Sequence, residues 1–308
     1  MKHLNKFSVL KIASGIVCLL LCTILPAQEP IQSEWIATQR AILASLTGEN
    51  TIVDDRKITS RWTAEERALS RQFLQEVFRN TSMELTEQPY RMPNLHAFQD
   101  LILGPFRGAN LFGILPATEA SNEYVILGAH YDTERKAPGA NDNASAIAVI
   151  YGVTKALQKL DRRDKNFLIV FFDQEEEENV GSRAFINYLK QQPWIISSVH
   201  TIDQMGWDKD QDRAIEIELP DEQLIPYYEA AGKAMTIHIH HTRVNASDHQ
   251  AFRKAGYVVT GITEEFANGD TSPYKDTPAD TMETIDFGYL KSTTDLLTQV
   301  FKDLLQAP

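Results

Sequence analysis

One histidine and several carboxylates follow short apolar runs that have the composition of β-strands. The run at residues 124–129 leads directly into His130, Tyr131 and Asp132. A histidine two residues before an aspartate suits a metal ligand whose imidazole is held in one tautomer by the carboxylate. The pair alone is weak evidence, because a hydrogen-bonded surface histidine can have the same local sequence.

Three further segments carry carboxylates at the end of a strand-like run or in a loop that follows one. Asp142 lies in the small-residue loop PGANDNASA, where a helix N-cap and a turn are the simpler interpretation. The apolar run at 167–172 is followed two residues later by four glutamates, at positions 175–178. A fourth segment, VHTID, ends at Asp203. Each of these segments, taken singly, is compatible with a structural role.

These residues would meet at one edge of the sheet if the runs are neighbouring strands. Several carboxylates within a few ångströms of one another are costly unless a cation neutralises them. Imidazole together with carboxylates suits zinc, and two such ions, about 3.5 to 4 Å apart and bridged by one carboxylate, can share an activated water. The sequence therefore predicts a metal site at this edge.

Strand-like runs alternate with helical patterns along most of the chain. The predicted strands are 110–115, 124–129, 167–172, 199–203, 214–219, 237–241 and 257–262. The predicted helices are 33–46, 63–78, 144–160, 183–190, 221–234, 247–254 and 287–305. The second helix opens with a capping box, Thr63 to Glu66. We expect an α/β fold with a mostly parallel central sheet covered by helices on both faces, whose ligands bind beyond the carboxyl ends of the strands.

Composition and charge exclude several classes of function. A hydrophobic content of 43% is enough for a substantial core. The formal net charge of −12 repels nucleic acid and anionic lipid, and no basic cluster opposes it. No glycine-rich phosphate-binding loop follows a strand. We therefore expect neither a nucleic-acid partner nor a nucleotide cofactor.

Residues 1–27 have the pattern of a secretory signal peptide. Lys2, Lys6 and Lys11 precede an apolar stretch at 12–25, which ends in Leu-Pro-Ala. Loss of these three lysines would take the formal charge from −12 to −15. The expected location is periplasmic or extracellular. The mature chain, 28–308, would be a single α/β domain whose first part, 28–108, is a helical flank.

Two alternatives to a cleaved signal are less favoured. The apolar stretch is short for a membrane-spanning anchor. Lipidation at Cys22 would require a small residue before it, and Leu21 is large. Cys18 and Cys22 are the two cysteines of the chain, so cleavage would leave the mature protein without a disulfide or a thiolate ligand.

Taken together, the motifs resemble those of metallopeptidase family 28, the co-catalytic di-zinc aminopeptidases related to bacterial leucyl aminopeptidase, glutamate carboxypeptidase and glutaminyl cyclase. The similarity covers roughly residues 110–305. Its motifs are GAHYDT, PGANDNAS, a glutamate pair five and six residues before Gly181-Ser182, DQMG, SDH at 247–249 and TPADT at 277–281. The resemblance implies a zinc aminopeptidase that acts on peptides with a free N-terminus.

The resemblance also implies a role for each candidate residue. The implied ligands of two zinc ions are His130 and Asp203 for one ion, Glu176 for the other, and Asp142 for both. Glu175 would be the general base, which takes a proton from a metal-activated water and passes it to the leaving amine. Asp132 would be the partner that orients the imidazole. Glu177 and Glu178 are expected to be exposed.

One position departs from the family pattern. The family has a histidine before the Thr-Pro of its Thr-Pro-x-Asp-Thr segment, where this chain has Asp276. We favour Asp276 as a ligand of the second zinc, because aspartate is an ordinary zinc ligand. The alternatives are a weak or empty second site, or a histidine from elsewhere, the candidates being His238, His240, His241 and His249. A second site made only of oxygen would hold zinc loosely and tolerate manganese, cobalt or magnesium.

Three functions remain open on the sequence. The leading one is a secreted, metal-dependent aminopeptidase. The second is a glutaminyl cyclase-like acyltransferase, which would use one zinc to form N-terminal pyroglutamate. Asp276 keeps the second open, whereas the DNAS loop and the short glutamate segment favour the peptidase. The third, a non-catalytic binding domain, would require the loss of more ligands or of the base.

Overall fold

The computed structural model describes residues 32–94 and 97–307, so the predicted signal segment at 1–27 lies outside the described residues. Residues Gln32–Pro308 form one compact unit. Its helices are α1 Gln32–Leu46, α2 Ala64–Phe78, α3 Ala97–Leu103, α4 Ala146–Leu157, α5 Val180–Leu189, α6 Ile225–Met235, α7 Ser247–Lys254 and α8 Phe287–Gln306. Its strands are β1 Thr86–Met92, β2 Phe106–Leu115, β3 Glu123–His130, β4 Asn166–Phe172, β5 Ile195–Ile202, β6 Ile215–Glu218, β7 Ile239–Thr242 and β8 Val259–Thr263. None of the helices described is both long and apolar enough to cross a membrane.

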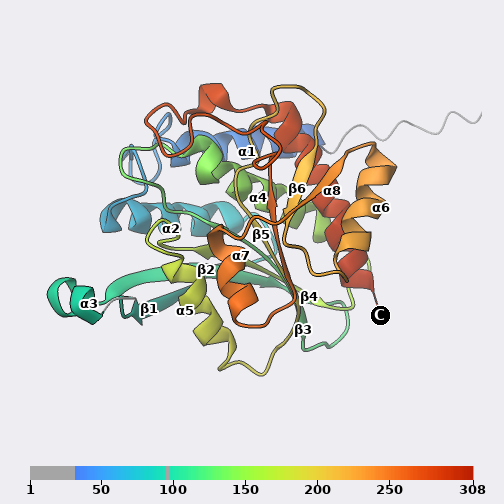
Figure 1. Ribbon diagram of the computed structural model, residues 1–308, viewed down its shortest axis with the longest axis horizontal. Coiled ribbons are helices and arrows are strands. Elements are labelled where there is room, and N and C mark those ends of the chain that lie inside the picture. The colour runs from blue at the N-terminus through green and yellow to red at the C-terminus, as the bar shows by residue number, and fades with distance from the viewer. Residues whose placement is uncertain (1–31, 95–96, 308) are drawn as a thin grey trace, which may run out of the picture. The chain divides into compact units, whose positions relative to one another are not determined.

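The eight strands form one mixed sheet in the order β1-β2-β4-β3-β5-β8-β6-β7 (Figure 1). The four central strands, β4, β3, β5 and β8, run parallel, whereas β1, β2 and β6 add antiparallel pairings. Every residue of β4 is buried, as expected for a parallel strand covered on both faces. The carboxyl ends of the parallel strands therefore lie along one edge of the sheet.

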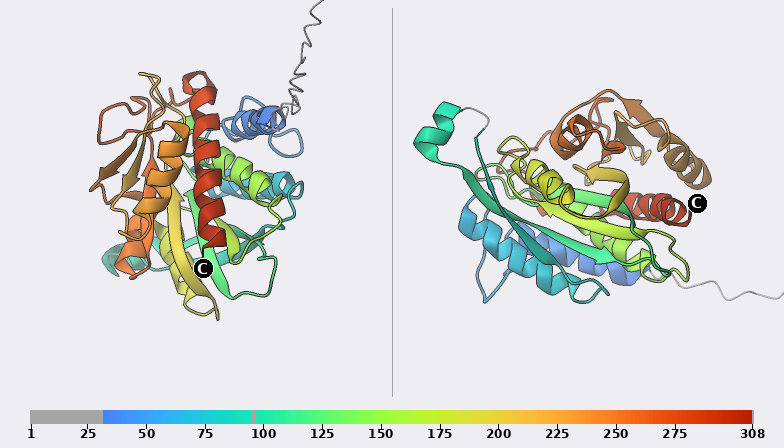
Figure 2. Two further views of the ribbon diagram at one scale, coloured as in Figure 1. Left: turned by 90° about the vertical axis from the view of Figure 1, so that its right-hand side faces the viewer. Right: turned by 90° about the horizontal axis from the view of Figure 1, so that it is seen from below.

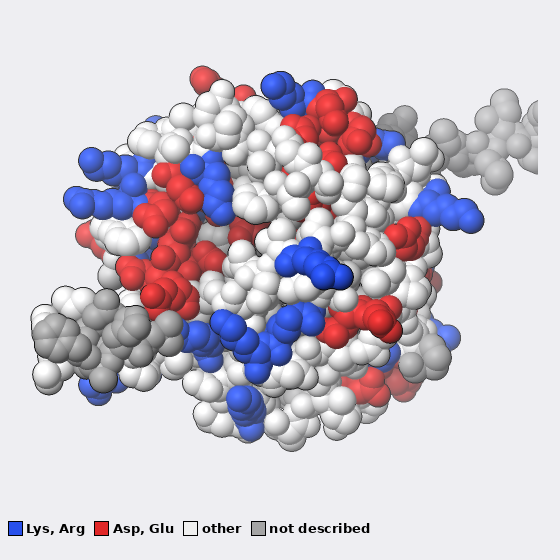
Figure 3. All heavy atoms as spheres, viewed as in Figure 1, with Lys and Arg blue, Asp and Glu red and all other residues white. Residues whose placement is uncertain are grey.

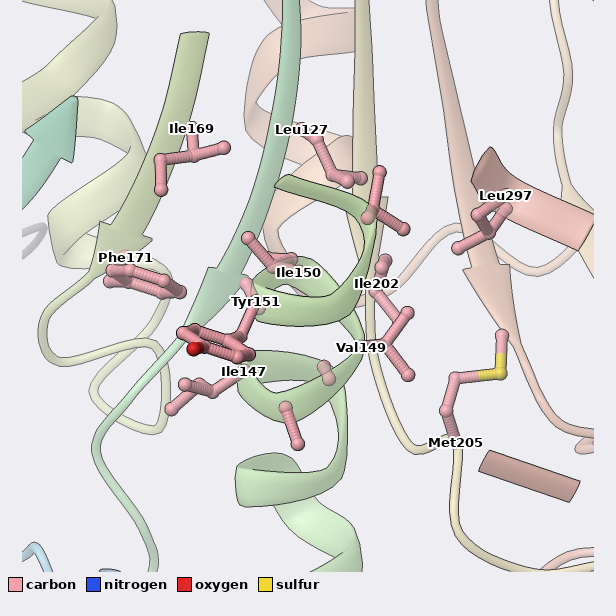
Figure 4. Packing of buried hydrophobic residues seen from close by; sticks show 14 of the residues in the cluster. Leu127, Ile147, Val149, Ile150, Tyr151, Ile169, Phe171, Ile202, Met205 and Leu297 are labelled. Carbon is pink, nitrogen blue, oxygen red and sulfur yellow. The ribbon is translucent and has the colours of Figure 1, made fainter. Parts of the chain in front are cut away.

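Helices cover both faces of the sheet (Figure 2). On one face, α1, α2, α4 and α8 bury a large apolar cluster against β3 and β4. In Figure 4, Ile147, Ile150 and Tyr151 of α4 point toward the strands that carry Leu127 and Phe171. On the other face, α5 and α7 pack on a smaller, more aromatic cluster. The predicted α/β architecture with two covered faces is confirmed.

Two parts of the chain differ in detail from the sequence prediction. The expected helix at 144–160 is observed as α4 at Ala146–Leu157, after a π-helical turn, Ala140–Ser145, which is kinked because the backbone of Asp142 and Asn143 is not helical. The expected helical flank, 28–108, also contains β1, which the sequence did not reveal. Pro89 interrupts the pattern of β1, and it is tolerated because β1 pairs on one side only, at the edge of the sheet. The capping box of α2, by contrast, is present as predicted, with Thr63 and Glu66 each bonding the other's backbone.

Arg61 fastens the loop that leads toward Asp142. Its side chain is fully buried and donates to four backbone carbonyl oxygens. The acceptors are those of Tyr131 at 2.6 Å, Leu46 at 2.8 Å, Pro138 at 2.7 Å and Gly139 at 2.9 Å. Burial lowers the pKa of Arg61 to about 10, which leaves the guanidinium charged at neutral pH. A single side chain thus ties the end of α1 to the segment between β3 and the π-helical turn.

Replacing Arg61 by methionine is expected to lower the free energy of unfolding by roughly 3 kcal/mol or more, because the change leaves several buried carbonyl oxygens without donors. Urea unfolding followed by circular dichroism measures the difference. Arg56→Met is the control, since Arg56 is exposed and lies 3.8 Å from Asp54. Its effect should stay within about 0.5 kcal/mol. Equal stability of the two variants would contradict the role given to Arg61.

Candidate metal centre

The π-helical turn that carries Asp142 is fixed through its backbone. Gly139, just before the turn, has a left-handed backbone with φ of +67°, and a side chain there would collide with the backbone of Asp142. The carboxylate of Asp280 accepts the backbone N–H groups of Asn141 and Asp142 at 2.8 and 3.0 Å. Backbone contacts therefore help to fix the position of the Asp142 carboxylate, in addition to any hydrogen bonds of its own side chain.

His130, Asp142 and Asp203 bring three polar atoms together. The Nε2 atom of His130 lies 3.1 Å from Asp142 Oδ1 and 3.5 Å from Asp203 Oδ1. Each of the three atoms is buried and has no hydrogen-bond partner among the described residues. Buried polar atoms are rarely left in this state, and an imidazole nitrogen with two carboxylate oxygens is an ordinary donor set for zinc. The donor set and its unsatisfied state fit a zinc ion.

Asp132 connects the imidazole to the glutamate segment. Its carboxylate accepts the backbone N–H of Glu175 at 3.0 Å and that of Glu176 at 3.3 Å. One of its oxygens lies 3.5 Å from His130 Nδ1. Because Nδ1 faces Asp132, Nε2 is the ring nitrogen directed at the other carboxylates. Asp132 therefore orients both the ring and the loop that carries the glutamates.

The structure also brings together the residues predicted for a second ion. Asp142, Glu176 and Asp276 each offer an oxygen, and these oxygens lie within 4.8 Å of one another. His130, Glu175 and Glu176 form a further group, whose ligand atoms also lie within 4.8 Å of one another. Asp276 is exposed, and it has a left-handed backbone with φ of 58°. The group that contains Asp276 has no nitrogen donor.

Glu175 and Glu176 point into this cluster, whereas the next two glutamates do not join it. Glu177 is half-buried, so the expectation of exposure is accurate only for Glu178. Burial, and next the charge of Asp142, raises the pKa of Glu176 to about 10. Burial also raises the pKa of Glu175 well above its usual value. Without a cation, the carboxyl group of Glu176 would hold a proton at neutral pH.

Three other histidines pair with glutamates outside the cluster, and His200 bonds the hydroxyl groups of Tyr228 and Ser198. Within the described residues, His130 is the one histidine that belongs to a group able to hold a metal. The pairs are His240 with Glu265 at 2.9 Å, His241 with Glu229 at 2.7 Å and His249 with Glu218 at 3.5 Å, while His238 contacts the ring of His240 edge-on. These contacts favour strand and pocket-wall roles over substitution for the missing histidine.

Sequence reasoning missed two buried acids that support the site. Asp280 lies in the TPADT motif, but nothing in the motif showed that it holds the backbone at Asp142. Glu264 is fully buried directly after β8, and it accepts hydrogen bonds from Asn141 Nδ2 at 3.0 Å and from the backbone N–H of Trp207 at 3.0 Å. The available signal was the same one used for the ligands, a carboxylate at the end of a parallel strand.

A pocket of about 590 Å³ opens beside the glutamates. Glu176, Glu177 and Glu178 line one wall, and residues 103–107 at the start of β2 line another. Figure 3 shows acidic side chains gathered in a band on one part of this face, with basic side chains bordering it. The pocket adjoins the carboxylate cluster through Glu176, which belongs to both.

The fold and the donor groups define an α/β protein of the metallopeptidase class. The chain belongs to peptidase family M28, whose family model matches residues 110–301. The resemblance found in the sequence motifs is thereby confirmed.

Among curated proteins, the chain is 27% identical over 221 residues to aminopeptidase YwaD of Bacillus subtilis. The match covers 70% of this chain and 47% of that protein, so the chain spans about half the length of this relative. A solved zinc aminopeptidase from Bacillus subtilis is 22% identical, with a TM-score of 0.60 and coverage of 65% of this chain and 51% of that one. A solved glutaminyl cyclase from an Acidobacteriales bacterium is 19% identical, with a TM-score of 0.70 and coverage of 92% and 99%. At such identities the structural likeness establishes a shared fold.

Zinc affinity is expected to rise with pH. Burial opposes a charge on His130, but the neighbouring aspartates outweigh it and raise the pKa of the imidazole well above its usual value. Zinc binds the neutral ring and ionised carboxylates, so binding must release the protons that the metal-free site holds. We expect roughly a tenfold gain in affinity per pH unit for each proton displaced, measured by chelator competition between about pH 6 and about pH 8.

The surface variant His241→Ala serves as the control for this measurement. Its slope of affinity against pH should equal that of the wild type, because His241 lies outside the metal-binding groups. An affinity that does not change with pH would show that the cluster holds no protons for zinc to displace.

Proposed function

We propose that this protein is an exported zinc-dependent aminopeptidase, which removes N-terminal residues from peptides. The observation that carries the proposal is the convergence of three buried, unpartnered donor atoms, on His130, Asp142 and Asp203, beside a glutamate that is free to act as a base. Membership of peptidase family M28 supports peptides as the substrate class. The proposed export rests on the signal-like sequence at 1–27.

The chemistry divides between the ligand residues and Glu175. Bound zinc would supply Lewis acidity, which lowers the pKa of water and polarises the scissile carbonyl group. His130, Asp142 and Asp203 would hold the ion. Glu175 takes a proton from the attacking water as the new C–O bond forms, and it returns that proton to the nitrogen as the C–N bond breaks. The products are a free amino acid and a peptide shorter by one residue.

Asp132 would make this division of labour possible. By accepting the backbone N–H groups of Glu175 and Glu176, it fixes the two glutamates side by side. One of them can then ligate a cation while the other remains free for proton transfer. Hydrolysis needs Glu175 to stay free of metal, because a carboxylate engaged by metal is a poor base.

The acidic pocket fits the amino end of a substrate. Glu176, Glu177 and Glu178 line its wall, so a protonated N-terminal amine would meet negative charge there. An incoming carboxylate would meet repulsion at the same wall. The three glutamates outnumber Arg107, which also lines the pocket, so the pocket favours aminopeptidase over carboxypeptidase action.

The number of ions is part of the proposal. Asp142, Glu176 and Asp276 form an all-oxygen group, which would hold a second ion more weakly than the group that contains His130. Manganese or cobalt would be accepted there about as readily as zinc. A glutaminyl cyclase-like acyltransferase is the second candidate, because one complete zinc group is sufficient for that reaction.

Replacing Glu175 by glutamine is expected to reduce kcat about 10³-fold while zinc content stays the same, because the amide cannot accept the proton from water. The assay is the hydrolysis of a panel of amino-acid p-nitroanilides by metal-stripped protein reconstituted with zinc. Glu222→Gln is the control, since Glu222 is exposed and belongs neither to the metal groups nor to the pocket beside the glutamates, and it should retain wild-type activity.

A peptide with N-terminal glutamine separates the two candidate reactions. Hydrolysis releases free glutamine, whereas cyclisation releases ammonia and leaves the peptide at its full length. Mass spectrometry of the products distinguishes these outcomes. Loss of ammonia without amino-acid release would replace the aminopeptidase by the cyclase.

A further inference from the structure

The two carboxyl oxygens of Asp142 face different partners. Oδ1 lies 3.1 Å from His130 Nε2, on the side of the complete zinc group. Oδ2 lies 3.5 Å from the ammonium of Lys275 and accepts a hydrogen bond from Gln204 Nε2 at 3.4 Å. A carboxylate that bridges two ions gives one oxygen to each ion. The oxygen that a second ion would use therefore already has a cation and an amide donor beside it.

Lys275 is next in the chain to the one ligand position that departs from the family pattern. The chain has an aspartate at 276, where the family has a histidine, and a lysine directly before it. Asp276 has a left-handed backbone within a turn in which the N–H of Thr277 donates to the carbonyl oxygen of Tyr274 at 3.1 Å. Lys275 is only 36% exposed, and its ammonium lies among carboxylates instead of extending into solvent. Compared with the family pattern, this segment therefore lacks a nitrogen donor at position 276 and has the positive charge of Lys275 beside it.

Charge balance alone does not choose between one ion and two, but the repulsion between a second ion and the ammonium favours one. The carboxylates of Asp142, Glu176, Asp203 and Asp276 carry four negative charges. One divalent ion together with the ammonium leaves a net charge of −1, whereas two divalent ions together with the ammonium leave +1. A second ion would also lie within a few ångströms of the ammonium, and like charges at that distance repel strongly in a partly buried site. The lysine thus lowers the affinity of the second position for a metal.

We propose that the ammonium of Lys275 occupies the second cation position of this site, so that the protein carries one tightly held zinc. This inference rests on the proposed zinc centre and adds to it the identity of the second positive charge. The ammonium neutralises the side of Asp142 that faces away from His130. It also leaves Glu176 without a permanently bound metal.

The test is zinc binding by Lys275→Met, whose side chain keeps most of the length of lysine but loses its charge. We expect the wild type to retain one zinc after gel filtration in metal-free buffer, as measured by inductively coupled plasma mass spectrometry. Lys275→Met should retain close to two. Isothermal titration should give a dissociation constant for the second zinc at least tenfold lower than in the wild type, while the first changes little.

Two further variants separate charge from structure. Lys275→Arg keeps the positive charge and should retain one zinc. Lys291→Met is the matched control, because Lys291 is 38% exposed and its ammonium also pairs with an aspartate, Asp295, at 2.8 Å on α8. It should bind zinc as the wild type does. An unchanged first zinc in Lys275→Met establishes that the variant has folded with its site intact.

Two tight zinc ions in the wild type, or equal binding of the second zinc by the wild type and Lys275→Met, would overturn the inference. These measurements contain no substrate, so they do not depend on which reaction the protein performs. Absence of p-nitroanilide hydrolysis together with the expected zinc pattern would reject the aminopeptidase and leave the role of Lys275 standing. Hydrolysis together with two tightly bound ions would reject the role of Lys275 and leave the aminopeptidase standing.

Discussion

The structure depends on the burial of several like charges at the carboxyl edge of a parallel sheet. The segments after β3, β4, β5 and β8 all contribute acidic side chains to this edge, and most of them are withdrawn from water. In such surroundings each carboxylate requires hydrogen-bond donors or a cation. The loops, the capping contacts and the buried basic side chains near the edge help to meet this requirement.

The buried carboxylates meet this requirement in two ways. Those that accept backbone N–H groups have a structural role, and those that lack donors are candidates for metal binding. Asp280 and Glu264 accept backbone N–H groups, so the protein itself supplies their hydrogen-bond donors, while burial still raises the pKa of Asp280 to about 6 and that of Glu264 to about 7. Asp142 and Asp203 each leave an oxygen facing His130 with no donor among the described residues. Supporting carboxylates thus fix the backbone around the site, and the incompletely satisfied ones can bind a cation. Arg61 also supports the backbone near the site, as a buried cation that donates to carbonyl oxygens.

Lys275 changes the balance of a site whose ligands otherwise follow the family pattern. In a centre with two divalent ions, a second metal would supply the positive charge on the outer side of Asp142. Here an ammonium is already next to that oxygen. With a single zinc, as proposed, such a centre would combine the fold of the family M28 peptidases with the one-metal requirement of an acyl transfer within a peptide N-terminus. The fold is common to solved proteins of both kinds, so the site alone must decide between the reactions.

Much of the fold and most of the site could be predicted from the sequence for a local reason. Buried parallel strands are continuous apolar runs, and their ends are marked by the first polar residues, which is how His130, the glutamates at 175–178 and Asp203 were found. Asp142 lies one loop further on, and the family resemblance singled out Glu175 and Glu176 among the four glutamates. The edge strand β1 was missed because Pro89 breaks its pattern, and only pairing with β2 compensates for that residue.

The sequence by itself determined the α/β class, the order of the strands along the chain and the donor types, because these follow from residue chemistry and short-range spacing. The tertiary structure decided which donors meet, which remain without partners, and that Lys275 faces Asp142. Those outcomes depend on the direction of side chains that are distant in the sequence. Periodicity carries no information about such directions, since they are set by the pairing of strands and the packing of loops.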